Sequence, residues 1–350
     1  MHRPVDDLRI QATRPLLPPA ILIEEVPQSD AAADLVASAR ETVRQILYGQ
    51  DDRLLVVVGP CSVHDVDAAR EYGERLKPHA ERLAEDLFVV MRTYFEKPRT
   101  VGGWKGLIND PDLDETFKIN KGVRLARHLL RDICDIGLPC ATEFLDMTVP
   151  QYIADFVCWG AIGARTVESQ THRELASGLS MPVGFKNATD GRIQPAIDAV
   201  QSARMAHWFP STTKDGVAAL SYSTGNDCGH VVLRGGASGP NYDAPTVAET
   251  AAKLAQEGLP DRLMVDCSHG NSGKDPEKQK VVAAHLAAQI AKGSKHIMGV
   301  MLESHLVGGR QDYVAGQARY GQSVTDACLG LDDTVPLLDE LAAAVRNARS

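Results

Sequence analysis

A cysteine directly after a short apolar segment raises the first chemical question in this sequence. In LLVVVGPCSVHD, residues 54–65, five apolar residues run into Gly-Pro, and Cys61 and His64 follow. Four roles are open to Cys61: a small core residue, half of a disulfide, a nucleophile or a metal ligand. The choice depends on which other reactive side chains the fold brings to the same place.

Reactive side chains also follow the later apolar segments. In chain order they are Arg92, Glu143, Arg165, Lys186, Arg234, Asp266 with His269, Glu303 with His305, and then Asp326. A thiolate, an imidazole and two carboxylates from this group suit a borderline transition metal, because Mg²⁺ and Ca²⁺ prefer oxygen ligands alone. These four are Cys61, His269, Glu303 and Asp326. We therefore favour metal ligation for Cys61 over a nucleophilic role, since the nearest base, His64, is expected to begin the following helix.

Basic residues form a second group at the same segment ends. They are Arg92, Lys97, Arg99, Arg165, Lys186 and Arg234. Gathering like charges is unfavourable unless an anion offsets them, and the Arg fork matches phosphate and carboxylate oxygens. The sequence therefore predicts a site for two or more phosphates or carboxylates in a chain whose net charge is -9.

These side chains meet only if the apolar segments form one parallel structure. The segments are LLVVVG, LFVVMR, LPCATEF, DFVCWGAIGA, MPVGFK, HVVLRGG, RLMVDCSH and HIMGVMLES. Near-continuous apolar strands are typical of a parallel sheet covered by helices, and amphipathic helical patterns lie between them. Eight such units favour an α/β fold of the (β/α)₈ TIM-barrel type over an open doubly wound sheet. In a barrel the C-terminal strand ends converge on the active site.

Two segments lie outside the repeat. Residues 1–45 are expected to form an N-terminal extension with a strand in AILIEEVP, residues 20–27, and an Ala-rich helix, serving regulatory or oligomer contacts. Residues 46–350 are expected to form the catalytic barrel. Within it, residues 206–227 have alternating apolar arms around TKDG, which predicts an inserted β-hairpin with an Asp-Gly turn.

Composition excludes several classes of protein. Hydrophobic residues make up 44% and charged residues 24%, which is ordinary for a soluble globular chain. No apolar run approaches the roughly 20 residues of a membrane span, and the acidic charge argues against a nucleic-acid partner. The N-terminus lacks a secretory pattern, and seven Cys without a C-x-x-C pair do not form a disulfide framework. We expect a cytoplasmic protein with no membrane contact and a reduced Cys61.

Seven segments carry a resemblance to a known family. They are GPCSVHD, MRTYFEKPRTVGGWKGLINDP, ATEFLD, GARTVESQTHRELASGLSMPVGFKN, VLRGG, DCSHGNS and GVMLESHLVGGRQ. They resemble the type I, alpha-subgroup 3-deoxy-D-arabino-heptulosonate-7-phosphate (DAHP) synthases over essentially the whole chain. KPRT with GPCS separates this group from the octulosonate 8-phosphate synthases, which have an Asn-rich substrate loop. The resemblance implies a metal-dependent transferase that condenses phosphoenolpyruvate with D-erythrose 4-phosphate and water in the first step of the shikimate pathway.

The resemblance also implies roles for single residues. Cys61, His269, Glu303 and Asp326 would hold one divalent ion per subunit, Mn, Co, Fe or Zn. Arg92, Arg165, Lys186 and Arg234 would hold phosphoenolpyruvate, and Lys97, Arg99 and Thr100 would bind erythrose 4-phosphate. Because the aldehyde must be polarised and a water activated, Lys97, Lys186 and Glu143 are the candidate catalytic residues. The alternative for Glu143 is a partner to one of the arginines.

Members of this subgroup are commonly inhibited by one aromatic amino acid. The matching positions here are Asp6, Asp7, Pro150, Gln151, Leu179, Ser180, Phe209 and Ser211. Ser211, where some relatives have Gly, favours phenylalanine, and tyrosine or tryptophan stay open. The alternative is that these residues form a subunit contact in a homodimer or homotetramer.

Two other functions compete with this interpretation. One is a different barrel aldolase or synthase, against which the KPRT loop and the absence of a His-rich cluster argue. The other is a non-catalytic barrel that senses an anion or an amino acid. A thiolate-containing ligand set beside the cations argues against a pure anion sensor.

Overall fold

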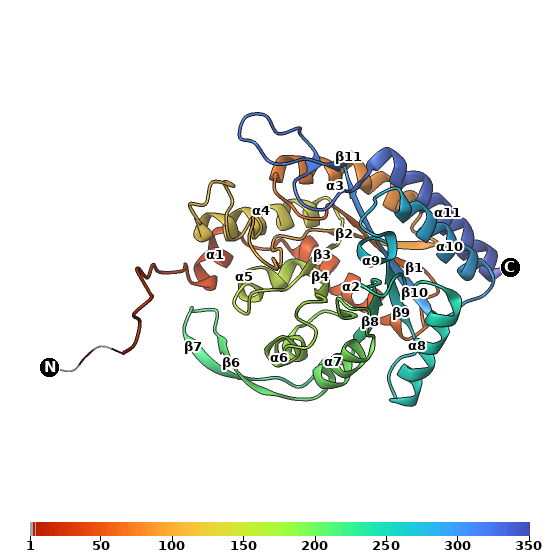
Figure 1. Ribbon diagram of the computed structural model, residues 1–350, viewed down its shortest axis with the longest axis horizontal. Coiled ribbons are helices and arrows are strands. Elements are labelled where there is room, and N and C mark those ends of the chain that lie inside the picture. Colours follow the sequence, from red (N-terminus) through yellow and green to blue (C-terminus); the bar gives the residue numbers. More distant parts are fainter. Residues whose placement is uncertain (1–2, 4) are drawn as a thin grey trace.

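Eight parallel strands close into a barrel in the computed structural model, which describes residues 3 and 5–350 (Figure 1). The strands are β1 Leu54–Gly59, β2 Leu87–Arg92, β3 Cys140–Glu143, β4 Val157–Ile162, β5 Val183–Lys186, β8 Gly229–Leu233, β9 Leu263–Asp266 and β10 Ile297–His305. They pair in this order, and β1 pairs in parallel with β10, which completes the ring. The predicted (β/α)₈ barrel is confirmed.

Helices surround the barrel between successive strands. They are α3 Val66–Arg82, α4 Ile119–Asp135, α5 Pro150–Ile153 with a 3₁₀ turn at Ala154–Phe156, α6 Gln170–Gly178, α7 Gln194–Arg204, α8 Ala244–Gln256, α9 His269–Ser272, α10 Lys278–Ala291 and α11 Leu331–Arg349. Among the described helices, none is long and apolar enough to cross a membrane. Short strands β11 Val307–Arg310, β12 Gln322–Ser323 and β13 Leu329–Gly330 lie in the segment between β10 and α11.

The strand expected at residues 20–27 is wrong: this segment contains helix α1, Pro19–Glu25. Pro19 at the first helical turn has a backbone suited to that position. Pro19, Leu22 and Val26 are buried at intervals of three and four residues, whereas Ile21 and Glu24 are exposed. This is the spacing of one helix face rather than of an alternating strand.

The Ala-rich helix α2, Asp30–Leu47, covers the N-terminal end of the barrel. Val43, Ile46 and Leu47 belong to the same buried cluster as barrel-interior residues such as Leu55 and Trp159. The exposed segment at residues 5–13 extends away from the body of the molecule (Figure 1), whereas Pro15 O accepts a hydrogen bond from Asn120 Nδ2 of α4 at 3.1 Å. The division at residue 45 into an extension and a barrel stays a prediction.

An antiparallel hairpin lies within residues 206–227. It consists of β6 Trp208–Thr212 and β7 Ala218–Tyr222, with Phe209 opposite Ser221. Gly216 in its turn has a φ of 76°, which an Asp-Gly turn supplies readily. The hairpin tip contacts the N-terminal region, because Ala20 N donates a hydrogen bond to Lys214 O at 2.7 Å.

The barrel interior is tightly packed around Trp159. Its Nε1 donates a hydrogen bond to His230 Nε2 at 3.1 Å, and burial lowers the pKa of His230 to about 4. The neutral imidazole of His230 therefore accepts a hydrogen bond from the indole N–H in the buried interior. Gly184 in β5 leaves room for the indole, since a Cβ there would lie 2.4 Å from Trp159 Cζ2 and 2.7 Å from Val232 Cγ2.

Gly184→Ala is therefore expected to lower the free energy of unfolding by about 1–3 kcal/mol, because the added methyl overpacks the core. Urea unfolding followed by tryptophan fluorescence measures this change. Gly102→Ala is the matched control, because its Cβ would meet no atom within 4 Å. Equal unfolding free energies for the two variants would contradict this account of the barrel interior.

Candidate active site at the mouth of the barrel

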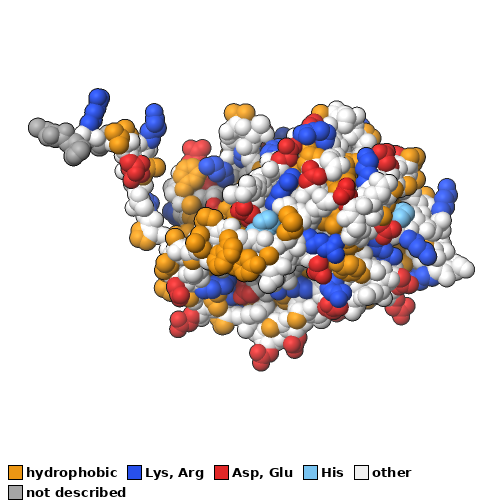
Figure 2. Space-filling view, turned by 90° about the horizontal axis from the view of Figure 1, so that it is seen from below, with side chains coloured by type: hydrophobic (Ala, Val, Ile, Leu, Met, Phe, Trp, Pro, Cys, Tyr) orange, Lys and Arg blue, Asp and Glu red, His pale blue; other side chains and the backbone are white. Residues whose placement is uncertain are grey.

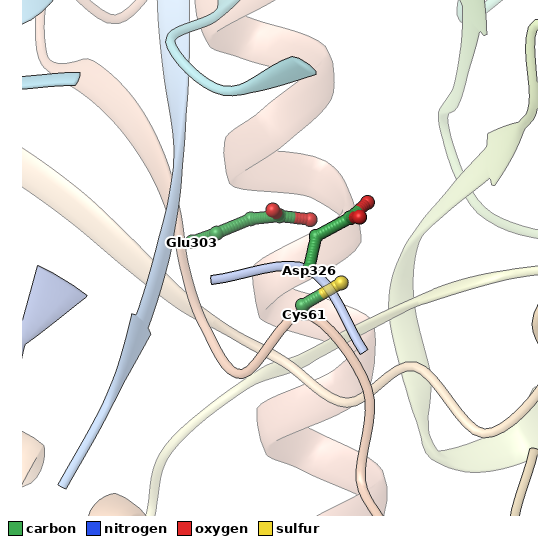
Figure 3. A group of neighbouring side chains, drawn as sticks. All are labelled: Cys61, Glu303 and Asp326. Carbon is green, nitrogen blue, oxygen red and sulfur yellow. The ribbon is translucent and has the colours of Figure 1, made fainter. Parts of the chain in front are cut away.

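A thiol and two carboxylates converge at the C-terminal end of β1. Cys61 follows β1, Glu303 belongs to β10, and Asp326 lies between β12 and β13. One ligand atom from each lies within 4.8 Å of the others, and the three side chains extend toward a common region (Figure 3). Strand register explains the meeting, since Gly59 of β1 pairs with Glu303 of β10.

His269 stands beside this cluster. Its Nε2 lies 3.7 Å from Glu303 Oε1, while its Nδ1 lies 2.9 Å from Asp266 Oδ2. The backbone φ of His269 is 56°, a left-handed conformation that is uncommon for a residue with a side chain. The structure thus gathers all four residues that the sequence suggested as ligands, with His269 slightly outside the tight group of three.

The donor set fits a borderline transition metal. One sulfur, one imidazole nitrogen and carboxylate oxygens are the ligands that such ions accept. Burial, together with the charge of Glu303, raises the pKa of the Cys61 thiol, although Lys97 and Arg92 act in the opposite direction. A metal binding there would therefore displace the thiol proton. Lys97 Nζ donates a hydrogen bond to Cys61 Sγ at 3.1 Å, so its positive charge would stabilise a thiolate at this position.

All six predicted cations line one cavity of about 100 Å³ beside this cluster. Within residues 3 and 5–350, Arg99, Arg165 and Arg234 form no ion pair; Arg165 Nε donates to Thr100 Oγ1 at 3.2 Å and Arg234 Nη1 to its neighbour Gly235 O. Guanidinium groups without a carboxylate partner are available to an anion. The cavity combines an anion site with the possible metal site.

The buried cations of the mouth are held by counter-ions. Arg92 Nη2 lies 2.9 Å from Glu303 Oε1, and its guanidinium stacks 3.5 Å above the ring of Tyr94. Lys186 Nζ lies 3.3 Å from Asp266 Oδ2 and 3.8 Å from Glu143 Oε2. Glu143 therefore pairs with a lysine rather than with an arginine among the described residues.

The loop after β2 brings Lys97 and Arg99 to the same cavity, and Thr100 contacts Arg165, which also lines it. Lys97 N donates to Lys105 O at 2.9 Å and closes the loop. Gly103 has a φ of 118°, and a Cβ there would lie 2.5 Å from Arg99 Nη2. Only glycine therefore leaves the Arg99 guanidinium its place.

Two residues of the site receive no role from the sequence, which places Asp266 at a segment end without a function and does not single out Glu96. Asp266 joins His269 to Lys186; burial alone raises its pKa, but His269 and Lys186 outweigh burial and hold the pKa well below its usual value. Glu96 precedes Lys97, and its Oε2 accepts hydrogen bonds from Leu145 N and Asp146 N at 3.4 and 3.5 Å. Both roles come from contacts between distant loops, which residue spacing does not reveal.

A second cavity of about 530 Å³ lies between α6 and the hairpin. Its lining includes six of the predicted effector residues, which are Pro150, Gln151, Leu179, Ser180, Phe209 and Ser211. The other two, Asp6 and Asp7, are not among its lining residues. They lie in the exposed N-terminal segment, which extends away from the rest of the molecule (Figure 1).

Comparisons with known proteins agree with one another. Residues 27–339 match the model of the DAHP synthetase I family. The chain is 56% identical over 345 residues to the Phe-sensitive phospho-2-dehydro-3-deoxyheptonate aldolase of Escherichia coli K12, covering 98% of each. It is 52% identical to the Trp-sensitive enzyme of Enterobacter agglomerans, covering 97% of this chain and 98% of that one. A solved phospho-2-dehydro-3-deoxyheptonate aldolase from Francisella tularensis superposes with a TM-score of 0.96 at 52% identity, covering 97% of this chain and 100% of that one.

Glu96 gives a pH-dependent test of the loop. Burial, with the nearby Asp146 carboxylate, raises the pKa of Glu96 from 4.5 to about 8. Its protonated form therefore stabilises the fold fully below about pH 4.5, and this contribution is lost as the pH rises toward about 8. Glu96→Gln is expected to be more stable than the wild type at about pH 9, by at most about 5 kcal/mol, with a smaller difference at about pH 5.

Thermal melting of both proteins across this pH range measures the effect. Glu249→Gln serves as the control, because Glu249 lies on the surface of α8 and pairs only with Lys253 in the next turn. A constant difference between Glu96→Gln and the wild type at all pH values would show that Glu96 does not titrate in this range.

Proposed function

Since this chain belongs to the DAHP synthetase I family and is an enzyme of that family, we propose that it condenses phosphoenolpyruvate with D-erythrose 4-phosphate and water. The products are 3-deoxy-D-arabino-heptulosonate 7-phosphate and phosphate, in the first step of the shikimate pathway toward the aromatic amino acids. One observation carries the proposal: six cations and a thiol–carboxylate cluster line the same mouth.

Phosphoenolpyruvate is assigned to Arg92, Arg165, Lys186 and Arg234. Arg165 and Arg234 have no carboxylate partner among the described residues, and they would take the phosphate. Arg92 and Lys186 are buried deeper and would face the carboxylate end. These roles are consistent with guanidinium recognition of phosphate and with ammonium recognition of a compact anionic group.

Erythrose 4-phosphate is assigned to the loop after β2. Arg99 and Thr100 are exposed at the rim of the cavity and would bind its phosphate. Lys97 reaches inward to Cys61 Sγ, which would place its ammonium beside the aldehyde oxygen. Lys97 then donates the proton that this oxygen needs when the new C–C bond forms to C3 of phosphoenolpyruvate.

Cys61, His269, Glu303 and Asp326 would hold one divalent ion, Mn²⁺, Co²⁺, Fe²⁺ or Zn²⁺. Such an ion supplies Lewis acidity toward a carbonyl oxygen. The protein's own contribution is to place the four donors beside the cations, with His269 and Asp326 lining the same cavity as the arginines. Arg92, ion-paired with Glu303, connects the two groups.

Water must then add to C2 of the phosphoenolpyruvate moiety before its phosphate leaves. Glu143 and Lys186, 3.8 Å apart, are the proposed pair that orients this water and takes its proton. Gly163 makes room for Glu143, since a Cβ at Gly163 would lie 2.4 Å from Glu143 Oε1. Cleavage of the C2–O bond then releases phosphate and leaves the ketone of the product.

Feedback inhibition by an aromatic amino acid is assigned to the cavity between α6 and the hairpin. Leu179 and Phe209 give it apolar walls, and Ser180 and Ser211 give it short polar groups, which suits an aromatic ring with a charged backbone end. Phenylalanine is favoured through Ser211, with tyrosine and tryptophan as alternatives. Relatives sensitive to different amino acids are almost equally similar to this chain, so overall identity does not choose between them.

A homodimer or homotetramer would complete this cavity. The outer face of the hairpin exposes Trp208, Leu220 and Tyr222 to 59–72%, and the two aromatic rings stack with centroids 4.8 Å apart. Figure 2, viewed from the hairpin side, shows hydrophobic side chains gathered on this face and the N-terminal segment projecting from the body. A second subunit covering this face would bring the carboxylates of Asp6 and Asp7 toward the amino group of a bound effector.

The reaction is tested by measuring phosphate release from phosphoenolpyruvate in the presence of erythrose 4-phosphate and Mn²⁺. Release that requires both substrates is expected from the wild type. Cys61→Ala is expected to release none while keeping its circular dichroism spectrum, because one of four ligands is lost. Full turnover by Cys61→Ala in metal-chelated buffer would refute the metal assignment, and no wild-type release would favour a sensor or another aldolase.

The effector is tested through initial rates at saturating Phe, Tyr and Trp. Phenylalanine is expected to inhibit most strongly, and Phe209→Ala is expected to weaken that inhibition by tenfold or more (about 1.4 kcal/mol of lost ring contact) without changing the uninhibited rate. Ser211→Gly is expected to shift the preference toward tyrosine. If Phe209→Ala and the wild type are half-inhibited at the same effector concentration, the effector binds elsewhere.

A further inference from the structure

One buried carboxylate joins the two halves of the active site. Asp266 ends β9 and has no exposed surface. Its Oδ2 lies 2.9 Å from His269 Nδ1 and 3.3 Å from Lys186 Nζ. Its Oδ1 accepts hydrogen bonds from Ser268 N at 3.0 Å and from Ser268 Oγ at 2.6 Å. A single oxygen therefore serves both the candidate metal-binding imidazole and a candidate substrate-binding ammonium.

The geometry fixes which nitrogen of His269 faces the cluster. Nδ1 lies 2.9 Å from Asp266 Oδ2, which can only accept, and 2.7 Å from Ser268 Oγ, whose own proton goes to Asp266 Oδ1. Both contacts therefore place the ring proton on Nδ1 and leave Nε2 as an acceptor toward the side of Glu303. A carboxylate behind a ligating histidine orients the ring and raises its basicity. The left-handed backbone of His269 persists only when surrounding contacts determine it, and the Asp266 and Ser268 contacts are among these.

The same oxygen fixes Lys186. This side chain is 3% exposed, and its ammonium contacts only the carboxylates of Asp266 and Glu143 among the ion pairs of the described residues. Its four-carbon stem has many rotamers, so these two contacts determine where the charge stands in the anion cavity. Glu143 is the longer contact, so Asp266 is the main anchor.

We infer that Asp266 is a positioning residue shared by the metal half and the anion half of the site: it holds His269 for the ion and Lys186 for phosphoenolpyruvate through one carboxylate oxygen. The inference rests on the proposed function, in that His269 is to bind a metal and Lys186 an anion. It goes further because Asp266 belongs neither to the candidate metal ligands nor to the candidate phosphoenolpyruvate-binding residues, yet it orients one member of each set. Asp266 itself touches neither ligand.

A general charge effect and a positioning role predict opposite changes in phosphoenolpyruvate affinity when Asp266 is neutralised. Neutralising a buried carboxylate in a cationic cavity strengthens the binding of any anion by electrostatics alone. A positioning role predicts the opposite for phosphoenolpyruvate, because Lys186 loses its anchor. The sign of the change in affinity therefore separates positioning from a general charge effect.

The test is Asp266→Asn, studied by calorimetric titration with MnCl₂ and, separately, with phosphoenolpyruvate in metal-free protein. Mn²⁺ affinity is expected to fall about 10- to 100-fold. Phosphoenolpyruvate affinity is expected to fall about tenfold, because Lys186 without its anchor loses one charged hydrogen bond to the anion. Neither measurement depends on turnover. Mn²⁺ affinity within twofold of the wild type, or tighter phosphoenolpyruvate binding, overturns the inference.

Two further variants keep the result interpretable. Asp86→Asn also removes a buried carboxylate, one paired with Arg346 and Arg349 outside the site, and it is expected to change melting temperature but neither affinity. In Asp266→Asn/Lys186→Met the ammonium leaves together with its counter-ion Asp266, so no cation loses that partner, and the Mn²⁺ affinity of this double variant is expected to be equally low. Wild-type Mn²⁺ affinity in the double variant overturns the inference alone, whereas a wild-type protein that binds neither Mn²⁺ nor phosphoenolpyruvate overturns the proposed function as well.

Discussion

The pairing of the first barrel strand with the last is the constraint on which the site depends. Gly59 of β1 lies in register with Glu303 of β10, and two residues later Cys61 meets the carboxylate cluster. Cys61 N also donates to Cys328 Sγ at 3.4 Å across 267 positions of sequence, which ties the loop carrying Asp326 to the same place. An open sheet would keep the cations at its strand ends, but it would separate the thiol from the carboxylates. Closure of the ring thus brings one sulfur and two carboxylates within 4.8 Å of one another, the one group of three or more such ligand residues in the described chain.

Burial divides the cations of the mouth into two kinds. Arg92 and Lys186 are almost fully buried and are paired with Glu303 and Asp266, because an unpaired buried charge costs several kcal/mol. Arg99 and Arg165 are exposed and keep their hydration without a carboxylate partner. The buried pairs give a rigid floor whose dipoles are oriented before any ligand arrives, which is how preorganised sites stabilise developing charge. The exposed arginines attract an anionic ligand without any rearrangement of the core.

Sequence pattern predicted the parts of the molecule that depend on periodicity. The eight apolar segments and the polar residues after them determine the barrel and the contents of its mouth, because parallel strands present their C-terminal ends on one side. The helix α1 was mistaken for a strand because AILIEEVP is short and apolar, and its length did not separate the two patterns; the buried spacing of Leu22 and Val26 decides it. Asp266 and Glu96 acquire their roles from contacts with β5, α9 and the loop after β3, which no local spacing encodes. Asp6 and Asp7 are not among the residues that line the cavity of the other six predicted effector residues, because position along the chain does not encode where an exposed terminal segment lies.

The loop after β2 carries the part of the site that is least tied to the barrel. Its anchors are polar and few: Lys97 N to Lys105 O, Arg165 to Thr100, and Glu96 to the backbone after β3. Residues 99–103 are exposed, so little apolar burial fixes them. A loop held in this way can differ in sequence without disturbing the strands beneath it, because surface loops on a rigid scaffold tolerate change. Under the proposed function, the candidate metal ligands and the phosphoenolpyruvate cations would act on any carbonyl partner, whereas Arg99 and Thr100 lie in the exposed part of this loop and would contact the second substrate. The choice of aldehyde would then depend on this loop rather than on the barrel.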